Sequence, residues 1–245
     1  MTAVRPDPDP NTPGHARFQA VARATLVAAV AWMASPVSAA PARYELDPVH
    51  TRVLFAVSHA GFSQALGTIS GSIGTLQFDP QDVSTARLEV SVPMQRLDLG
   101  DADWNRAALG TRLLDAQRWP QARFISTRIE PLGPDRFRVH GQLTLRGVTR
   151  EVPLEVTFNA LRRHPLPPFR RTAGFSASAS LSRSDFGIDA WPSSIGDRVE
   201  LRIEAEALRS AGAREGDAEA DTDAADTRGP EPIPPPPVRQ EPAAP

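Results

Sequence analysis

The sequence predicts an all-β fold, a closed antiparallel β-barrel with one short helical insertion, flanked by two ends of different composition. Three observations predict it. Apolar and polar residues alternate through most of the stretch from Tyr44 to Leu208, short turn signals separate the alternating runs, and the prolines cluster at the two ends of the chain. With 245 residues, of which 40% are hydrophobic, the chain is long enough to bury a core.

The amino-terminal residues have the order of a secretory signal peptide. Arg17 and Arg23 precede an uncharged, mainly apolar stretch, and small residues follow at 37–39. We therefore predict a signal peptide with an extended n-region over residues 1–39, and a periplasmic or secreted mature protein that begins near Ala40. An uncleaved membrane anchor is the alternative, because the uncharged run is nearly long enough to span a bilayer. The mature domain itself is not expected to insert stably into a membrane.

The alternation is clearest between residues 198 and 207, where Val199, Leu201 and Ile203 alternate with arginine and glutamate. A period of two indicates a strand with one apolar and one solvated face. The pattern recurs at Val53, Phe55 and Val57, at Leu88, Val90 and Val92, at Phe137 and Val139, and at Val152, Leu154, Val156 and Phe158. Turn signals lie at Asp79-Pro80, at 132–134, at Arg146-Gly147 and at 165–168. Such short connections require antiparallel neighbours, so we expect about eight strands in a barrel or a sandwich.

Glycines favour the barrel. Gly67, Gly71 and Gly74 lie in a stretch that is otherwise patterned like a strand. Glycine weakens a strand unless the chain must bend or bulge there, and a closed barrel requires such corners.

One segment departs from the strand pattern. Between Asp101 and Trp119, apolar residues recur at roughly helical spacing, and Asp101 or Asp103 is a suitable N-cap. We predict a short helix or helical loop, which Gly110 weakens and which ends before Pro120.

Several function classes find no support in the sequence. The chain has no cysteine, which excludes disulfides, thiolate catalysis and cysteine-ligated metals. Residues 40–208 carry a net charge of only +1, so nucleic acid is not an expected partner. The sequence contains neither a Gly-x-Ser-x-Gly elbow nor a phosphate-binding glycine loop. We therefore predict no catalytic residue and no cofactor.

Histidine offers the main hint of metal or acid–base chemistry. His50 and His59 flank one predicted strand, and Asp47 lies nearby. Nine residues of extended chain separate the two histidines by about 30 Å and place them on opposite faces, so we predict no metal site. His59 has the parity of the inward residues. It is either a hydrogen-bonded core histidine or a polar group at the barrel mouth that meets a ligand head group.

The densest cluster of polar residues is the segment from Arg183 to Ile188. Arg183 and Asp185 are either a structural pair that closes a turn, or Arg183 faces a phosphate or carbonyl of a ligand.

Taken in order, these motifs resemble those of YceI-like domains. The resemblance rests on residues 44–51 and 55–59, on Gly74 with 78–80, on Leu114-Asp115, on Trp119-Pro120 leading into 124–127, on 141–149 and on 183–188. It implies a lipocalin-like barrel whose lumen holds a polyisoprenoid or a similar isoprenoid chain, in the periplasm or outside the cell. Thr51 stands where serine is usual. The acidic, proline-rich segment 209–245, which we expect to be disordered, lies outside the resemblance.

We therefore expect an exported protein that binds an isoprenoid lipid in its lumen, with His59 and Arg183 as candidates to receive the head group. The candidate ligand-binding residues are His59, Phe55, Val57, Phe62, Trp104, Phe124, Phe158, Phe175, Arg183, Asp185 and Phe186. Two alternatives are open. One is an enzyme that acts on a lipid or small acid in the same cavity, with His50, His59 or Asp185 as acid or base. The other is a stress-related module that binds a protein partner. The sequence leaves the choice between a monomer and a homodimer open.

The predicted cleavage has a direct test. Protein exported by a bacterial host should have the intact mass of a chain that begins near Ala40, because the small residues at 37–39 suit signal peptidase. A mass that still includes residues 1–39 would contradict the prediction.

Overall fold

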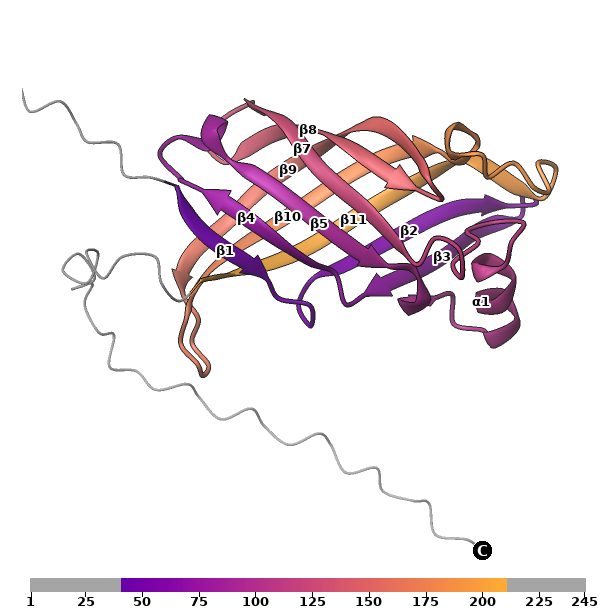
Figure 1. Cartoon of the computed structure of the whole chain (residues 1–245), viewed down its shortest axis with the longest axis horizontal. Helices are drawn as coiled ribbons and strands as arrows, with labels where there is room; N and C mark the ends of the chain where they lie inside the picture. The colour runs from indigo at the N-terminus through magenta and orange to yellow at the C-terminus, as the bar shows by residue number, and fades with distance from the viewer. Residues whose placement is uncertain (1–40, 211–245) are drawn as a thin grey trace, which may run out of the picture. The chain divides into compact units, whose positions relative to one another are not determined.

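The computed structural model describes residues 41–210, and these form a β-barrel with one short α-helix (Figure 1). The strands are β1 (Ala42–Leu46), β2 (Arg52–His59), β3 (Ser63–Ser70), β4 (Ile73–Phe78), β5 (Arg87–Pro93), β6 (Leu97–Asp98), β7 (Gln121–Pro131), β8 (Arg136–Leu145), β9 (Val148–Arg163), β10 (Arg171–Ser182) and β11 (Ile195–Arg209). The helices are α1 (Ala102–Leu109) and the 3₁₀ turns η1 (Val83–Thr85), η2 (Met94–Arg96) and η3 (Arg183–Phe186). The predicted fold class is confirmed.

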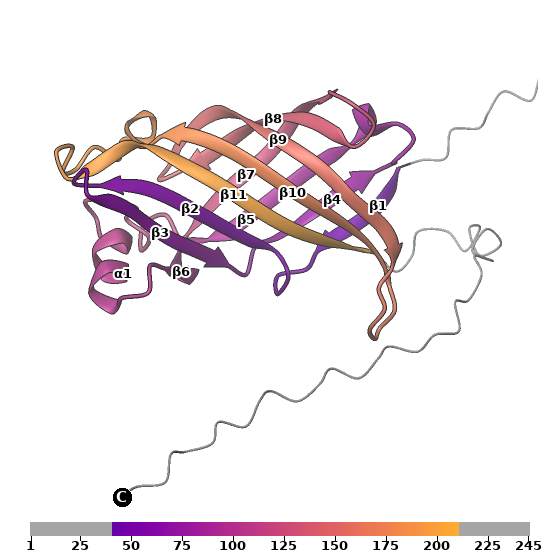
Figure 2. The ribbon, with the colours of Figure 1, turned by 180° about the vertical axis from the view of Figure 1, so that it is seen from behind.

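The barrel closes through strand β11. Around the barrel, the strands follow the order β1, β4, β5, β7, β8, β9, β10 and β11, and β11 returns to β1. β11 pairs with β1 only at its carboxyl end, where Leu46 faces Ala207. Its other half pairs with β2, from Glu204 facing Arg52 to Ile195 facing His59. Strand β3 pairs with β2 in an antiparallel hairpin. This β2–β3 hairpin widens the wall at the α1 end (Figure 2). Every pairing is antiparallel, as the short connections predicted.

Each of the alternating segments forms a strand in which every second residue points inward, and most of these inward residues are apolar. Along β7, for example, Ala122, Phe124 and Ser126 are buried while Arg123 and Ile125 are exposed. The predicted turn signals all lie between strands. The structured part reaches slightly beyond the predicted boundary at Leu208, since β11 includes Arg209. The signal peptide predicted over 1–39 lies outside the described residues, and so does the tail predicted over 209–245 except for residues 209 and 210.

The three glycines that favoured a barrel serve close packing and a turn rather than bulges. A Cβ atom on Gly67 would lie 2.3 Å from Cζ of Phe55, its cross-strand partner, so glycine makes room for the aromatic ring. Gly71 has a φ of +77° in the β3–β4 turn, where other residues are strained. The register shifts occur elsewhere, for example between Gly174 and Phe175.

The helical segment is confirmed over a shorter range than the sequence indicated. Asp101 is the N-cap, and its carboxylate accepts hydrogen bonds from the backbone amides of Asp103 and Trp104, both at 3.0 Å. The helix ends at Leu109 with Gly110 as its C-cap, and turns connect it to β7. Among the described residues, no helix has the length and apolar character needed to cross a membrane.

A buried arginine fixes the connection between β10 and β11. Arg183 is only 5% exposed, and its guanidinium donates to the carbonyl oxygens of Ile188 at 2.7 Å, Ile195 at 2.8 Å and Gly196 at 3.0 Å. On the outer side, Asp197 accepts hydrogen bonds from the Ser182 hydroxyl and from the Ser184 amide. These hydrogen bonds lower the pKa of the Asp197 carboxyl. The irregular chain from η3 to β11 is therefore held from both sides.

The turn from β1 to β2 is fixed by a carboxylate and an imidazole. Asp47 Oδ1 accepts hydrogen bonds from the amides of Val49 and His50, and Asp47 Oδ2 lies 2.8 Å from Nδ1 of His50. Burial tends to raise the pKa of Asp47, but the hydrogen bonds from the His50 ring and the two amides outweigh it and lower the pKa. The pKa of His50 is raised by its hydrogen bond to Asp47, by the charge of Asp47 and by the charge of Glu206. Burial acts in the opposite direction and lowers the pKa, but the raising effects outweigh it.

Replacing Arg183 should destabilise the barrel. We expect Arg183→Lys to lower the free energy of unfolding by about 2–4 kcal/mol, because one ammonium cannot satisfy three buried carbonyls in different directions. Urea denaturation measures the change. The matched control is Arg198→Lys on β11, whose side chain is 72% exposed and should change the stability by less than about 0.5 kcal/mol. Equal effects of the two substitutions would contradict this role.

The titration of His50 should report its contact with Asp47. The NMR titration midpoint of the His50 ring should lie above its usual 6.5, and Asp47→Asn should bring it back toward that value. Because the folded-state pKa is raised, the stabilisation from His50 is present below pH 6.5 and is lost as the pH rises through the folded-state pKa. A midpoint that does not respond to Asp47→Asn would refute the assignment.

Candidate functional site

A single large cavity occupies the interior of the barrel, with a volume of ≈ 570 Å³. Inward side chains from most of the barrel strands line it, and α1 and its following turn contribute Trp104, Ala107, Leu113 and Leu114. Many inward residues, such as Val53 and Leu201, are only half-buried although they point away from the outer solvent. An eight-stranded barrel can be wide enough to leave room for a ligand. In this barrel the aliphatic side chains do not fill the interior.

Aromatic side chains close the end of the cavity that lies far from α1. The ring centroid of Phe78 lies 5.2 Å from that of Phe158, 5.4 Å from that of Phe175 and 6.5 Å from that of Tyr44. Tyr44 and Phe78 are each 2% exposed. This aromatic cluster forms the floor of the cavity.

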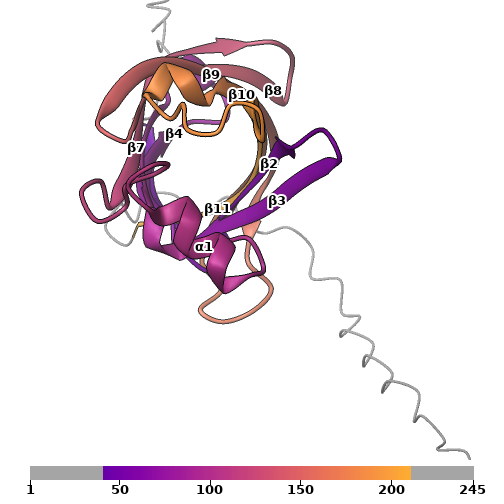
Figure 3. The same ribbon diagram turned by 90° about the vertical axis from the view of Figure 1, so that its right-hand side faces the viewer.

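The opposite end is the mouth, and Figure 3 looks into the barrel from that side, past α1 and the loop before β11. Lining residues here are solvent-accessible: Trp104 is 44% exposed, Trp191 is 38% exposed, and Ser194 is also exposed. The ring of His59 packs on that of Trp104 with centroids 5.1 Å apart, and Arg112 lies over the Trp191 ring at 4.7 Å. The tip of β2, helix α1 and the loop before β11 together form this mouth.

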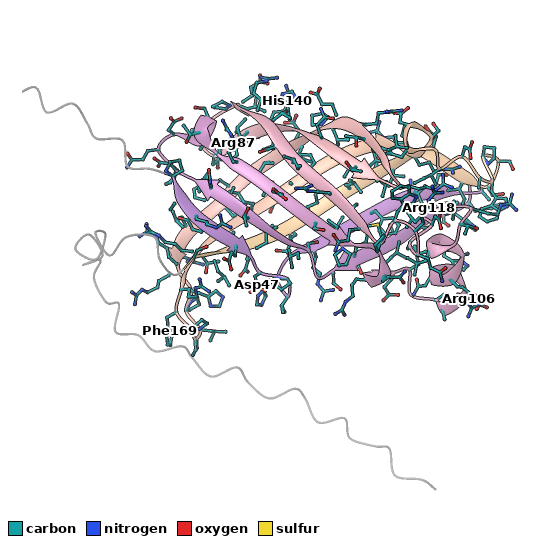
Figure 4. All side chains as sticks on the ribbon, in the orientation of Figure 1. Asp47, Arg87, Arg106, Arg118, His140 and Phe169 are labelled. Atoms are coloured by element: carbon teal, nitrogen blue, oxygen red, sulfur yellow. The ribbon has the colours of Figure 1, made fainter. Side chains whose placement is uncertain are left out.

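The cavity has almost no charge. Among the lining residues of the described range 41–210, only His59 and Arg183 can carry one. The guanidinium of Arg183 donates to three carbonyls and the residue is only 5% exposed, so this side chain chiefly supports the wall. The charged side chains of the strands point outward, as Figure 4 shows for Arg87 and His140. The site can therefore hold a long apolar molecule away from water.

The structure brings most of the predicted ligand-binding residues together. Seven of them line the cavity: Phe55, Val57, His59, Trp104, Phe124, Phe175 and Arg183. Of the two interpretations of His59, the structure agrees with the mouth position. For Arg183 it agrees with neither in full, because the partners are backbone carbonyls rather than Asp185 or a ligand.

Four predicted residues lie away from the cavity lining. Phe62 is 92% exposed in the β2–β3 turn, where the alternation of the strand has ended. Asp185 is exposed in η3, and the neighbouring Phe186 is 1% exposed within the core behind the lining. Phe158 belongs to the aromatic floor. Turns direct Phe62 and the η3 residues Asp185 and Phe186 away from the cavity. Phe158 lies in strand β9, does not itself line the cavity, and packs against the lining rings of Phe78 and Phe175.

Other lining residues were not among the predicted site residues. Val199, Leu201 and Ile203 line the cavity, and their strict alternation was the signal that could have identified them. Trp191 and Ser194 come from the irregular loop before β11, where no periodicity exists to indicate direction. Thr51 and Ser72 are polar lining residues in turns, where the sequence likewise has no periodicity that indicates their direction.

The acid–base groups considered in the sequence do not converge. His59 is at the mouth, Asp185 is outside the cavity, and His50 lies in the β1–β2 turn. Figure 4 shows Asp47, the partner of His50, on the outside of the barrel near the hairpin that carries Phe169. There Asp47, His50 and Glu206 place one ligand-type atom each within 4.8 Å of the others. His50 and His59 therefore do not share a site.

Comparison with known proteins agrees with this architecture. Residues 44–207 match the family model of the YceI-like domain. A UPF0312 protein of Pectobacterium atrosepticum is 32% identical over 185 residues, which cover 74% of this chain and 94% of the relative. A UPF0312 protein of Vibrio parahaemolyticus is 32% identical over 174 residues, which cover 70% of this chain and 91% of the relative.

Solved structures share the barrel. BcnA of Burkholderia cenocepacia has a TM-score of 0.59 at 25% identity, over 66% of this chain and 98% of that protein. A domain from Saccharophagus degradans, described as polyisoprenoid-binding, has a TM-score of 0.53 at 12% identity, over 69% of this chain and 99% of that domain. The matched residues, the closed barrel and the extent of the similarity give one conclusion: the chain belongs to the YceI-like family.

Proposed function

We propose that this protein binds a polyisoprenoid or a similar isoprenoid lipid inside the barrel. The observation that carries the proposal is the ≈ 570 Å³ cavity with carbon-lined walls, an aromatic floor and one accessible mouth. Pockets that bind small molecules typically have volumes of about 300–1,000 Å³. A branched, methyl-bearing hydrocarbon suits walls that are built mainly from aliphatic side chains.

The energetics favour an apolar ligand without specific polar contacts. Each buried CH₂ group contributes about 0.8 kcal/mol, so a chain of several isoprene units gains ample free energy of binding from transfer out of water. A ligand in the cavity would bury the inward side chains that are now half-buried, which adds apolar contacts on the protein side. The description of the Saccharophagus degradans domain as polyisoprenoid-binding is a further support for this ligand class.

We also propose that the protein acts after export, in the periplasm or outside the cell. The support is the basic, apolar and small-residue order of segment 17–39, which lies outside the described residues. An exported carrier would hold a lipid in an aqueous compartment where the free lipid is insoluble.

Filling the lumen should abolish lipid uptake. Ala177 on β10 points into the cavity, while its neighbour Ser178 is exposed on the outer face. We expect Ala177→Trp to reduce uptake of an added isoprenoid at least tenfold, because the indole occupies the space of the ligand. Ser178→Trp should leave uptake unchanged. The measurement is mass spectrometry of organic extracts from purified protein, before and after incubation with the isoprenoid, with circular dichroism to verify the fold of both variants.

The wild-type protein provides the decisive result for the proposal itself. Gently purified protein should release an apolar lipid into the extract, or should take up added isoprenoid at near-equimolar ratio. Absence of both would overturn the proposed function.

A further inference from the structure

The cavity ends at the same level on two neighbouring strands. On β10 its lining ends at Phe175, and on β11 it ends at Ala205, the register partner of Phe175. The next inward residues, Ala173 and Ala207, pair with each other, do not line the cavity and are each 0% exposed. A side chain without exposed surface contacts neither the outer solvent nor the space of the cavity. The barrel is therefore tightly packed beyond Phe175.

Aromatic rings form this boundary. Phe78 and Phe175 line the cavity, and Phe158 packs behind them, with its ring centroid 5.2 Å from that of Phe78 and 5.5 Å from that of Phe175. Tyr44 packs edge-on against Phe78 and is 2% exposed. A chain that enters through the mouth consequently meets the rings of the aromatic floor and does not pass through the barrel.

The two ends of the cavity differ in polarity. At the floor, Phe78, Phe175 and Ala205 offer only hydrocarbon to a ligand. An oxygen atom placed against them would lose its hydrogen bonds to water without replacement, which is unfavourable. At the mouth, His59 and the exposed Ser194 line the opening, and water reaches it. The hydrocarbon end of a lipid therefore fits the floor, and an end that carries oxygen fits the mouth.

Strand β11 gives the depth of the cavity. Its lining residues run from Ala205 at the floor to Ile195, which pairs with His59 at the mouth. With a rise of about 3.3 Å per residue and a strand tilt of about 40°, this stretch corresponds to a depth of about 25 Å. An extended isoprene unit has four chain bonds and a length of about 5 Å. About five such units therefore reach from the floor to the mouth.

We propose that the aromatic floor sets the isoprenoid chain length that the protein prefers, and that Phe175 is the residue that determines this length. The inference rests on the proposed function and adds the orientation and the size class of the lipid. The hydrocarbon end lies against Phe78 and Phe175, and the other end lies at the mouth. Each unit up to about five adds buried carbon and therefore affinity, whereas further units extend into water and add little.

A mixture of prenols of different length tests this inference. The full-length protein is incubated with equimolar all-trans prenols of three to eight isoprene units and repurified, and mass spectrometry of the organic extract gives the uptake of each length. Uptake by the wild type should rise with length to about five units and then level off. Phe175→Ala should move this limit to about six units, because the deleted phenyl ring leaves a space similar in size to one isoprene unit. The uptake ratio of the six-unit to the five-unit prenol should rise at least about fourfold, which is the effect of a single additional buried CH₂ group.

Ala205→Phe makes the opposite change at the same level of the barrel. The added ring occupies space above the floor, so the limit should fall to about four units. Phe62→Ala is the matched control, because it removes the same ring from a residue that is 92% exposed in the β2–β3 turn. It should keep the limit of the wild type. Circular dichroism verifies the fold of each variant, and Ala205→Phe decides the test if Phe175→Ala does not fold.

The outcomes separate this inference from the proposed function. An unchanged limit in a folded Phe175→Ala or Ala205→Phe protein would overturn the inference while leaving lipid binding intact. A shift of equal size in Phe62→Ala would also overturn it, since the floor would then not be the cause. Uptake of no prenol of any length by the wild type would count against the proposed function as well as this inference.

Discussion

The structure depends on the divided pairing of strand β11. Its carboxyl end hydrogen-bonds to β1 and closes an eight-stranded cylinder, while its amino-terminal half pairs with β2 and leads into the β2–β3 hairpin. At the β1 end the wall is complete and the aromatic floor closes it. At the β2 end the wall widens and is covered by α1 and a loop, which together form the mouth. The turns where β1 gives way to β2 also place Thr51 and Ser72 in the cavity wall.

The width of the barrel explains why the interior is hollow. Side chains from eight strands reach a shared axis only if they are large, and most of the inward residues here are valine, leucine, isoleucine or alanine. Larger aromatic side chains meet at the floor, where the ring centroids of Phe78 and Phe175 lie 5.4 Å apart. An unfilled apolar space costs dispersion contacts, and a hydrocarbon ligand restores them. Large side chains therefore close one end of the barrel, and smaller ones leave a cavity that opens at the other end.

The role of each polar group in the barrel depends on where it lies. Arg183 is a cavity-wall residue by location, yet its guanidinium holds the chain between η3 and β11. Asp47 and His50 fix the β1–β2 turn from outside. Apart from His59 and Arg183, the described lining residues of the cavity carry no charge, so the wall offers a ligand chiefly apolar contacts.

The sequence by itself determined the all-β class, the strands and inward faces of the clearly alternating runs, and the helical insertion, because a period of two, turn residues and an Asp101 N-cap are local signals. Strand parity also located Phe55, Val57 and His59 in the cavity wall. Tertiary structure alone decided the rest. The carbonyls around Arg183, the outward direction of Phe62 and the burial of Ser72 depend on turns whose geometry is set by contacts between segments distant in sequence. Parity carries no information beyond the end of a strand, and for that reason the loop residues of the mouth, Trp191 and Ser194, could not be predicted although His59 at the end of β2 could.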